Sequence, residues 1–283
     1  MELIHRTNDL RQFLQSHRST GKRIALVPTM GNLHAGHIRL VEEARKNSEI
    51  VVCTIFVNPL QFGANEDLDA YPRTLDEDMA KLQAAACDCV FAPSVTEVYP
   101  NGLQQQTVVS VPGVTMRHCG ASRPGHFDGV TTVVSKLFNM VEPDTALFGL
   151  KDYQQFTVIS KMVADLCMTV RLVGVETQRE ASGLALSSRN SYLSTDEKQR
   201  AAMLHEVLQL AAKQLRAGHA IVEVEAQAKT QLEGVGFRPD YFTVCHAQTL
   251  EPASITACDL VILAAAWMGT TRLIDNIRAQ RTL

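Results

Sequence analysis

Two histidines near the N-terminus have the spacing of a phosphate-binding pair. His34 and His37 lie three residues apart, after an apolar run and at the start of a helical pattern. At this spacing both imidazoles can face one side of the first helical turn, where free N–H groups and the positive end of the helix dipole attract phosphate. There they can donate hydrogen bonds to oxygens whose charge grows in a transition state. Gly31 and Gly36 allow the backbone to approach such a ligand closely.

The pattern around these histidines favours a function over simpler interpretations. A single histidine at the start of a helix would more often be an ordinary polar residue, but a pair between glycines in a strand–turn–helix context reverses that preference. Metal binding is disfavoured because H-E-x-x-H is absent and no third ligand is near. The sequence H-x-G-H in this setting resembles the nucleotidyltransferase superfamily that attacks the α-phosphate of ATP. The common P-loop and dinucleotide-binding glycine signatures are absent.

Four further segments place polar side chains where a ligand could meet them. Residues 56–62 (FVNPLQF) bring Asn58 and Gln61 to the end of an apolar run, where a substrate would bind, although Asn-Pro is also typical of a turn. Lys151 precedes a predicted helix and is a candidate phosphate ligand, although a lysine in a loop is usually only solvated. Residues 184–190 (LALSSRN) place two hydroxyls beside an arginine, as in a phosphate clamp or in a polar linker. Residues 122–130 (SRPGHFDGV) by themselves indicate only a loop.

Apolar runs alternate with helical patterns over the first two-thirds of the chain and predict the elements that position these residues. We expect strands at residues 24–28, 50–57, 89–92 and 170–175, and helices at 35–47, 74–86, 130–141 and 153–166. Thr74 and Glu77 have the spacing of a capping box. Continuously apolar strands that alternate with helices indicate an α/β fold, in which a parallel sheet is covered by helices on both faces.

A change in residue composition near residue 176 predicts a domain boundary. The chain there becomes polar and rich in Gly and Ser. Ser194 and Glu197 form a second capping-box pattern, which predicts a long helix that ends near Gly218. A helix at residues 221–232 and strands at 241–245 and 260–266 complete a small α+β unit.

The composition is that of an ordinary soluble chain. Its 283 residues include 27 basic and 30 acidic side chains, a formal net charge of −3, so nothing indicates a nucleic-acid-binding surface. No apolar run approaches the roughly 20 residues needed to cross a bilayer, and the polar N-terminus lacks the features of a signal peptide. The seven cysteines are scattered without C-x-x-C spacing, which indicates reduced thiols. We therefore expect a cytoplasmic protein that binds neither membranes nor nucleic acid.

Long, ordered motifs across nearly the whole chain resemble the pantothenate synthetase family. They run from residues 27–31 (VPTMG) through 56–62 (FVNPLQF) and 71–75 (YPRTL) to 272–276 (RLIDN). The resemblance implies an ATP-dependent ligase that joins pantoate to β-alanine through a pantoyl adenylate, requires Mg²⁺, and releases AMP and pyrophosphate. It also implies a homodimer. Each subunit would have a Rossmann-like domain at residues 1–176, which binds nucleotide and pantoate, and a smaller C-terminal lid domain at residues 177–283.

The resemblance also assigns roles to individual residues. The catalytic residues would be His37, as proton donor, with His34, Lys151 and Arg189. The residues that would bind ATP are Met30, Gly31, His34, His37, Gly149, Lys151, Asp152, Gln178, Leu186, Ser187, Ser188 and Arg189. The residues that would bind the other substrates are Asn58, Gln61, Tyr71 and Gln155, of which Gln61 and Gln155 would hold pantoate. Two positions depart from the pattern: Leu150 replaces an expected charged residue, and Ser182 replaces an expected aspartate of the lid loop.

Two other functions share part of this pattern. A phosphopantetheine-type adenylyltransferase would share H-x-G-H, but it gives no reason for the paired glutamines or for the LSSRN loop. A non-catalytic nucleotide sensor would not need Lys151 and both histidines, and a turnover assay separates it from an enzyme. Nothing in the sequence supports a purely structural protein.

Overall fold

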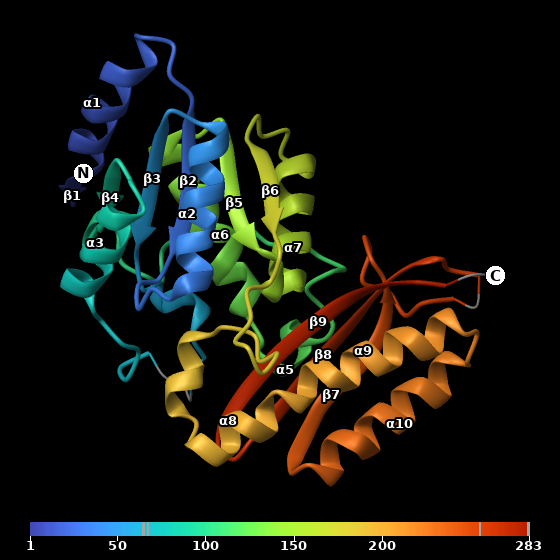
Figure 1. Ribbon diagram of the computed structural model, residues 1–283. Helices are drawn as coiled ribbons and strands as arrows, with labels where there is room; N and C mark the ends of the chain where they lie inside the picture. The colour runs from blue at the N-terminus through green and yellow to red at the C-terminus, as the bar shows by residue number, and fades with distance from the viewer. Residues whose placement is uncertain (64–65, 67, 255, 282–283) are drawn as a thin grey trace. The chain divides into compact units, whose positions relative to one another are not determined.

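The computed structural model describes residues 1–63, 66, 68–254 and 256–281. The chain divides into two units, both drawn in Figure 1. The N-terminal unit comprises residues 1–150 and 158–176, and the C-terminal unit comprises residues 151–157 and 177–283. The short segment 151–157 therefore belongs with the C-terminal part of the chain, and it contains two of the predicted site residues, Lys151 and Gln155.

A six-stranded sheet in which all strands are parallel forms the centre of the N-terminal unit. Its strands are β1 (Glu2–Ile4), β2 (Ile24–Thr29), β3 (Ile50–Ile55), β4 (Cys89–Phe91), β5 (Thr145–Gly149) and β6 (Arg171–Val175), in the spatial order β1-β4-β3-β2-β5-β6. The four predicted strands are confirmed as β2, β3, β4 and β6. The strand order reverses between β2 and β5, and ligands of open α/β sheets bind at such a switch point, beside the carboxyl ends of the strands.

Helices surround this sheet, as predicted. They are α1 (Thr7–Arg18), α2 (Ala35–Asn47), α3 (Leu75–Ala84), α4 (Val95–Val98), α5 (Cys119–Ser122), α6 (His126–Val141) and α7 (Tyr153–Asp165), with short 3₁₀ helices η1 (Pro59–Gln61) and η2 (Leu150–Asp152) (Figure 1). Val41 of α2 and Leu82 of α3 share one hydrophobic cluster with Val27 of β2. The neighbouring Leu26 points to the opposite face of the sheet and is also fully buried. Both faces are therefore covered, which explains why β2 is apolar without alternation.

The predicted capping box at the start of α3 is wrong. Thr74 precedes the helix, but its side chain makes no capping hydrogen bond. Its hydroxyl instead donates to the carboxylate of Asp78, one turn into the helix. The Thr74 hydroxyl is therefore turned towards Asp78, and it does not accept the N–H of Glu77.

A three-stranded antiparallel sheet and several helices make up the described part of the C-terminal unit, as the predicted α+β class requires. The strands are β7 (Phe237–His246), β8 (Asp259–Met268) and β9 (Thr271–Gln280), in that spatial order, and the helices are α8 (Thr195–Ala201), α9 (Met203–Arg216), α10 (Ile221–Gly234) and a 3₁₀ helix, η3 (Ser188–Tyr192). Leu208 of α9 packs with Phe242 of β7 and Ile262 of β8 in one core. The capping box of Ser194 and Glu197 is confirmed. The long helix predicted after it is broken at Ala202, whose carbonyl accepts a tight i,i+3 hydrogen bond from His205.

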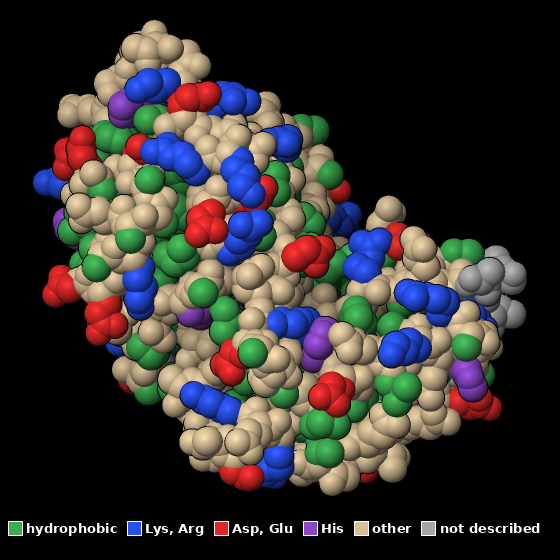
Figure 2. Space-filling view, viewed as in Figure 1, with side chains coloured by type: hydrophobic (Ala, Val, Ile, Leu, Met, Phe, Trp, Pro, Cys, Tyr) green, Lys and Arg blue, Asp and Glu red, His purple; other side chains and the backbone are tan. Residues whose placement is uncertain are grey.

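The surface agrees with the near-neutral composition. Lys and Arg side chains are interspersed with Asp and Glu side chains over the face drawn in Figure 2. Among the described residues, no helix combines the length and the apolar character that a membrane crossing needs.

Candidate active site

The loop that follows β2 is held in place by one buried carboxylate. Asp78 is fully buried and accepts hydrogen bonds from the backbone N–H groups of Asn32 (2.8 Å) and Leu33 (2.7 Å). The ammonium of Lys81 donates to the carbonyl of Leu33 at 2.8 Å and lies 4.0 Å from the Asp78 carboxylate. Helix α3 therefore fixes the segment between β2 and α2, which contains Met30 and leads into His34.

Gly31 is required at the start of this loop. Its φ angle is +82°, a left-handed conformation that favours glycine. A Cβ atom there would lie 3.1 Å from Ile55 Cγ2 and 3.2 Å from the Asp78 carboxylate. The glycine therefore serves both the turn and the close approach of Asp78.

His34 and His37 form a reciprocal cap at the start of α2. His34 Nδ1 accepts a hydrogen bond from the backbone N–H of Gly36 at 3.1 Å, and His37 Nδ1 accepts from the backbone N–H of His34 at 3.3 Å. The ring centroids are 4.1 Å apart with an interplanar angle of 32°. Because each Nδ1 is an acceptor, the proton of each neutral ring is on Nε2. The pair thus places two Nε2–H groups at one helix start, beside the switch point of the sheet.

Asn58 uses its whole side chain within the protein. It is 1% exposed, and its amide nitrogen donates to the side-chain oxygen of Gln61 and to the carbonyl of Gly129, both at 3.1 Å. Its side-chain oxygen accepts from the backbone N–H of Leu60 at 3.3 Å and from the hydroxyl of Tyr99 at 2.7 Å. Two donor and two acceptor positions are all that an amide has. The structure therefore gives Asn58 the role of holding Gln61.

Gln61 is oriented by contacts of both its side chain and its backbone. Its side-chain oxygen accepts from Asn58, and its side-chain nitrogen lies 3.2 Å from the sulfur of Met30. Its backbone carbonyl accepts from the ring of His126 at 2.8 Å and from the guanidinium of Arg123 at 3.3 Å. Three predicted residues, Met30, Asn58 and Gln61, are thus brought together.

The loop at residues 122–130 has a structural role that the sequence did not reveal. Arg123 forms an ion pair with Glu66 at 2.5 Å and contacts Nε2 of His126 at 3.0 Å. Burial opposes ionisation of Glu66, but the hydrogen bond and charge of Arg123 outweigh it and lower the pKa of this carboxyl. Tyr71, a predicted neighbour of the pocket, is buried with its ring edge against Phe62.

The remaining predicted residues follow β5 or lie in the C-terminal unit. Gly149 ends β5, and a Cβ built there would meet nothing within 4 Å, whereas Leu150 opens η2 and is half-buried. Lys151 is 18% exposed, with its ammonium 3.6 Å from the Asp152 carboxylate. Gln155 is half-buried in the first turn of α7.

The loop that contains the predicted phosphate-binding hydroxyls is also ordered by its own contacts. The carbonyl of Gln178 accepts from the N–H of Leu186 at 2.9 Å, which closes a turn. Ser187 caps η3 by accepting from the N–H of Arg189 at 3.3 Å. Ser188 follows as the first residue of η3. Ser182 lies at the tip of this turn, where its hydroxyl accepts from the N–H of Leu184 at 3.4 Å.

The predicted site residues therefore belong to two units. Those in the N-terminal unit are Met30, Gly31, His34, His37, Asn58, Gln61, Tyr71 and Gly149; those in the C-terminal unit are Lys151, Asp152, Gln155, Gln178, Leu186, Ser187, Ser188 and Arg189. Two residues that hold the site were not predicted from the sequence. Asp78 looks like one of several acids in a first helical turn, and Arg123 lies in a loop whose pattern indicated no role.

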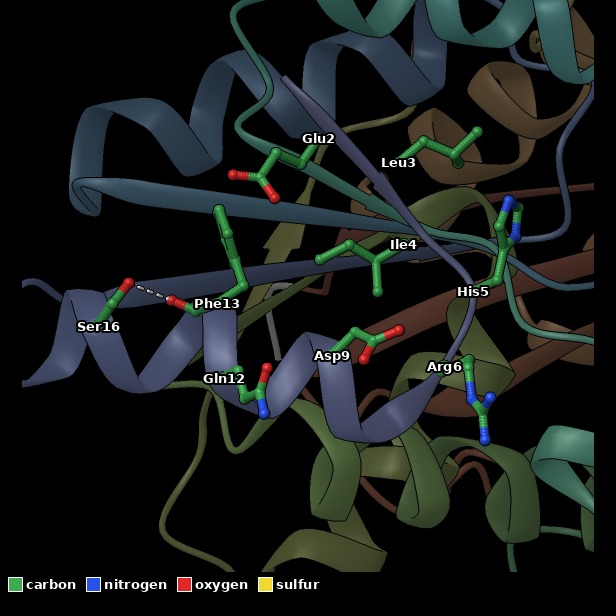
Figure 3. A pocket seen from close by; sticks show the side chains of 9 residues that line it. All are labelled: Glu2, Leu3, Ile4, His5, Arg6, Asp9, Gln12, Phe13 and Ser16. Carbon is green, nitrogen blue, oxygen red and sulfur yellow. Dashed lines mark hydrogen bonds between the residues drawn. The ribbon is translucent and has the colours of Figure 1, made fainter.

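Two surface pockets lie away from these residues. One, of about 580 Å³, lies between β1 and α1 and is lined by Glu2, Leu3, Ile4, His5, Arg6, Asp9, Gln12, Phe13 and Ser16 (Figure 3). The other, also of about 580 Å³, lies in the C-terminal unit and is lined by Gln199, Arg200, Met203, Gly234, Val235 and Gly236. None of the predicted site residues lines either pocket.

Known proteins match the chain along almost its entire length. The family described as pantoate-beta-alanine ligase matches residues 2–278. A pantothenate synthetase of Hahella chejuensis is 54% identical over 278 residues, 98% of each chain. One of Shewanella amazonensis is 56% identical over 270 residues, 95% of this chain and 96% of the relative.

Solved structures give the same result. A pantothenate synthetase of Thermus thermophilus superposes with a TM-score of 0.92 at 44% identity, covering 98% of this chain and 99% of that one. A pantoate-beta-alanine ligase of Francisella tularensis, solved with beta-gamma ATP and beta-alanine, has a TM-score of 0.81 at 31% identity and covers 98% and 97% of the two chains. The strand order, the histidine pair after β2 and these matches agree, and the chain belongs to the pantoate–β-alanine ligase family.

Proposed function

We propose that this ligase activates pantoate by adenylation at the histidine pair and then transfers the pantoyl group to β-alanine. The observation that supports this most directly is the reciprocal cap of His34 and His37, which turns two Nε2–H donors into fixed features of the helix start. Preorganised donors of this kind stabilise charge without reorganising during the reaction. Anions also favour a helix N-terminus at the end of a parallel strand.

The chemistry needs activation because a carboxylate has no good leaving group. An oxygen of the pantoate carboxylate attacks the α-phosphorus of ATP, and the bond to pyrophosphate breaks as the acyl phosphate bond forms. His34 and His37 donate hydrogen bonds from Nε2 to the α-phosphate and to the bridging oxygen. His37, the predicted proton donor, would face the bridging oxygen as that oxygen takes up the electron pair of the broken bond. The neutral amine of β-alanine then attacks the acyl carbon, the bond from that carbon to the phosphate oxygen breaks, AMP leaves, and the nitrogen loses a proton to solvent as the amide forms. An amine with an ordinary pKa of about 10 must lose its proton first, and orientation beside the adenylate supplies much of the remaining gain.

Pantoate would be held by Gln61 and Gln155, each of which has an amide donor and an amide acceptor. Tyr71 would line the same pocket, and Asn58 would set the orientation of Gln61 through its own hydrogen bond. The relative solved with beta-gamma ATP and beta-alanine supports the same pair of ligands for this chain.

The phosphates of ATP would be bound by Lys151 and Arg189, with the hydroxyls of Ser187 and Ser188. Met30, Gly31, Gly149, Asp152, Gln178 and Leu186 would complete the nucleotide site. Within the described ranges no cluster of three or more His, Cys, Asp or Glu side chains could hold a metal ion. Phosphate oxygens suit Mg²⁺, which commonly binds through substrate phosphates and one or two carboxylates. Asp152 is the carboxylate beside Lys151, and the bound ion would neutralise charge on the leaving group.

Exchange of labelled pyrophosphate into ATP tests the proposal. Exchange should require pantoate but not β-alanine, because the adenylate forms before the amine enters. A requirement for β-alanine, or the release of ADP and phosphate, would contradict adenylation. Exchange or adenylyl transfer that depends on phosphopantetheine rather than pantoate would favour the alternative adenylyltransferase.

Three further features belong to the same proposal. Residues 177–283 would act as a lid that keeps water from the adenylate, so omission of β-alanine from the assay should give only slow AMP release. The enzyme would be a homodimer, which light scattering at micromolar concentration tests. The seven cysteines are thiols rather than members of disulfides, which supports a cytoplasmic location.

A further inference from the structure

Strand β9 has two neighbouring polar side chains that face opposite ways. Asp275 is 4% exposed and lies on the face that packs against the helical core, together with Leu273 and Ala279. Asn276 follows it and points to the other face, because successive side chains of a strand alternate. The backbone N–H of Asn276 donates to the Asp275 carboxylate at 2.8 Å, which links the two. The pair is the end of the RLIDN motif, to which the proposed reaction gives no role.

Asp275 holds the turn that precedes the predicted phosphate-binding hydroxyls. Its carboxylate accepts two hydrogen bonds from the guanidinium of Arg179, at 2.6 and 2.9 Å. Arg179 also donates to the carbonyl of Gly183 at 3.2 Å and pairs with Ala185 across the turn. A bidentate pair of this kind fixes orientation as well as distance. The segment that contains Gln178 and residues 186–189 is thereby anchored to β9.

Asn276 holds the segment that contains the proposed catalytic lysine. Its amide nitrogen donates to the backbone carbonyl of Lys151 at 2.9 Å. On the same face, Arg278 donates to the hydroxyl of Tyr153 at 3.0 Å, and that hydroxyl donates to the carbonyl of Ala247 at 3.1 Å. The backbone from which the Lys151 side chain extends is therefore tied to β9 by a side chain that need not touch any substrate.

We propose that Asp275 and Asn276 are positioning residues for adenylation. Strand β9 fixes the positions of both segments that are proposed to bind phosphate. Asp275 positions the loop that contains Arg189, and Asn276 positions the segment that contains Lys151. The proposal rests on the proposed function, because it assumes that Lys151 meets charge that grows as pyrophosphate leaves. A displacement of about 1 Å of such a group reduces the rate of the chemical step without removing the binding site.

A double-mutant cycle in single turnover tests the Asn276 arm. The measured quantity is the rate of pantoyl adenylate formation at saturating ATP. It is compared among the wild type, Asn276→Ala, Lys151→Ala and the double variant. Gln280→Ala, at an exposed position of the same strand, is the control. We expect Asn276→Ala to lower the rate at least about tenfold while the pantoate KM changes less than about twofold. In the Lys151→Ala background the same change should have almost no further effect, because residues that act through one another are not additive. Asn276→Asp, which keeps the shape but replaces the donor by an acceptor, should match Asn276→Ala.

The same measurement tests the Asp275 arm through Arg179. Arg179→Ala and Arg179→Lys leave the residues of β9 unchanged, and lysine, which cannot make the bidentate pair, should recover only part of the rate that alanine loses. The outcomes separate the positioning role from the reaction. A wild-type enzyme without pantoate-dependent adenylate would overturn the proposed function itself. Three outcomes would overturn the positioning role alone, provided that the wild type forms adenylate. These are a normal rate in Asn276→Ala, a normal rate in Lys151→Ala, and an equal fold loss on Asn276→Ala in the wild-type and Lys151→Ala backgrounds.

Discussion

The imidazole of His34 lies against the imidazole of His37, with the ring centroids 4.1 Å apart. Each ring holds a backbone N–H of the same helix start through Nδ1. Protonation of an Nδ1 atom would remove a cap, and protonation of both rings would bring two like charges together at the positive end of a helix dipole. The pair is therefore arranged to work as two neutral donors, in agreement with a role in holding phosphate oxygens.

Replacement of His34 by asparagine should separate capping from chemistry. Asparagine is among the best N-cap residues and can accept the hydrogen bond of Gly36 through Oδ1, but it has no group at the position of Nε2. We expect His34→Asn to keep the melting temperature within a few degrees and to lower the rate of adenylate formation by about 100-fold, the scale of losing one preorganised donor. His219→Asn, at an exposed position, is the control. A large fall in melting temperature with a normal rate per folded molecule would assign His34 to structure alone.

Asp78→Asn should destabilise the loop after β2. An amide can offer only one oxygen where the carboxylate accepts from both Asn32 and Leu33, so a buried N–H group faces another donor. The expected cost is about 1–3 kcal/mol of unfolding free energy, the scale of an unsatisfied buried group. Urea unfolding measures it, with Asp76→Asn, an exposed acid of the same helix, as control. Equal stability of the two variants would show that the loop does not depend on Asp78.

Helices and strands with a strong local pattern could be predicted from the sequence, whereas features that depend on distant partners could not. Helix α2 begins and ends where its pattern indicates, at Ala35 and Asn47. Strand β9 was missed because Arg272, Asp275 and Asn276 interrupt its apolar residues, and the ion pair of Asp275 and the hydrogen bond of Asn276 are made with residues about a hundred positions away. The capping box at Thr74 is wrong because its hydroxyl is turned to the buried carboxylate of Asp78, which lies outside the local pattern.

The same distinction holds for the site. Residue types around His34 predicted phosphate chemistry, but no pattern indicated that Asn58 would use all of its hydrogen bonds inside the protein. Its saturation depends on Tyr99 and Gly129, which only the fold brings near.

Gln61→Ala and Gln155→Ala should weaken pantoate binding far more than ATP binding. Each loss leaves a polar group of the bound acid unpaired, at a cost of about 1–3 kcal/mol. Calorimetric titration with pantoate and with an ATP analogue measures both affinities, and Gln199→Ala, at an exposed position of α8, is the control. If both ligands lose affinity equally, these glutamines support the fold rather than the acid.

Raising the pH above about 9 should destabilise the N-terminal unit through its buried thiols. Burial raises the pKa of Cys87 to about 11 and that of Cys89 to about 12. The folded state therefore keeps the neutral thiol while the unfolded chain ionises at about 8.5, so their contribution is complete below that pH and is lost as the pH rises towards about 11. The slope should reach about 1.4 kcal/mol per pH unit for each thiol.

Urea unfolding between about pH 7.5 and pH 10 measures this slope, and Cys87→Ala should reduce it whereas Cys258→Ala, at an exposed position, should not. Iodoacetamide at about pH 8 should likewise modify the exposed Cys167 and Cys258 well before Cys87 or Cys89. Rapid modification of Cys87 in the native protein would contradict this account.

Helix α6 approaches η1 closely at Gly129, and this contact determines which element would have to move to enlarge the space beside Gln61. A Cβ atom on Gly129 would lie 2.2 Å from the carbonyl oxygen of Leu60 and 2.7 Å from the backbone nitrogen of Gln61. The position of the Gln61 backbone is thus set by its contact with α6, a helix far along the chain. The contact is this close because residue 129 has only a hydrogen atom as its side chain. Attempts to make the enzyme accept a bulkier acid should therefore begin with the tilt of α6, since exchanges at Gln61 alone leave its backbone where it is.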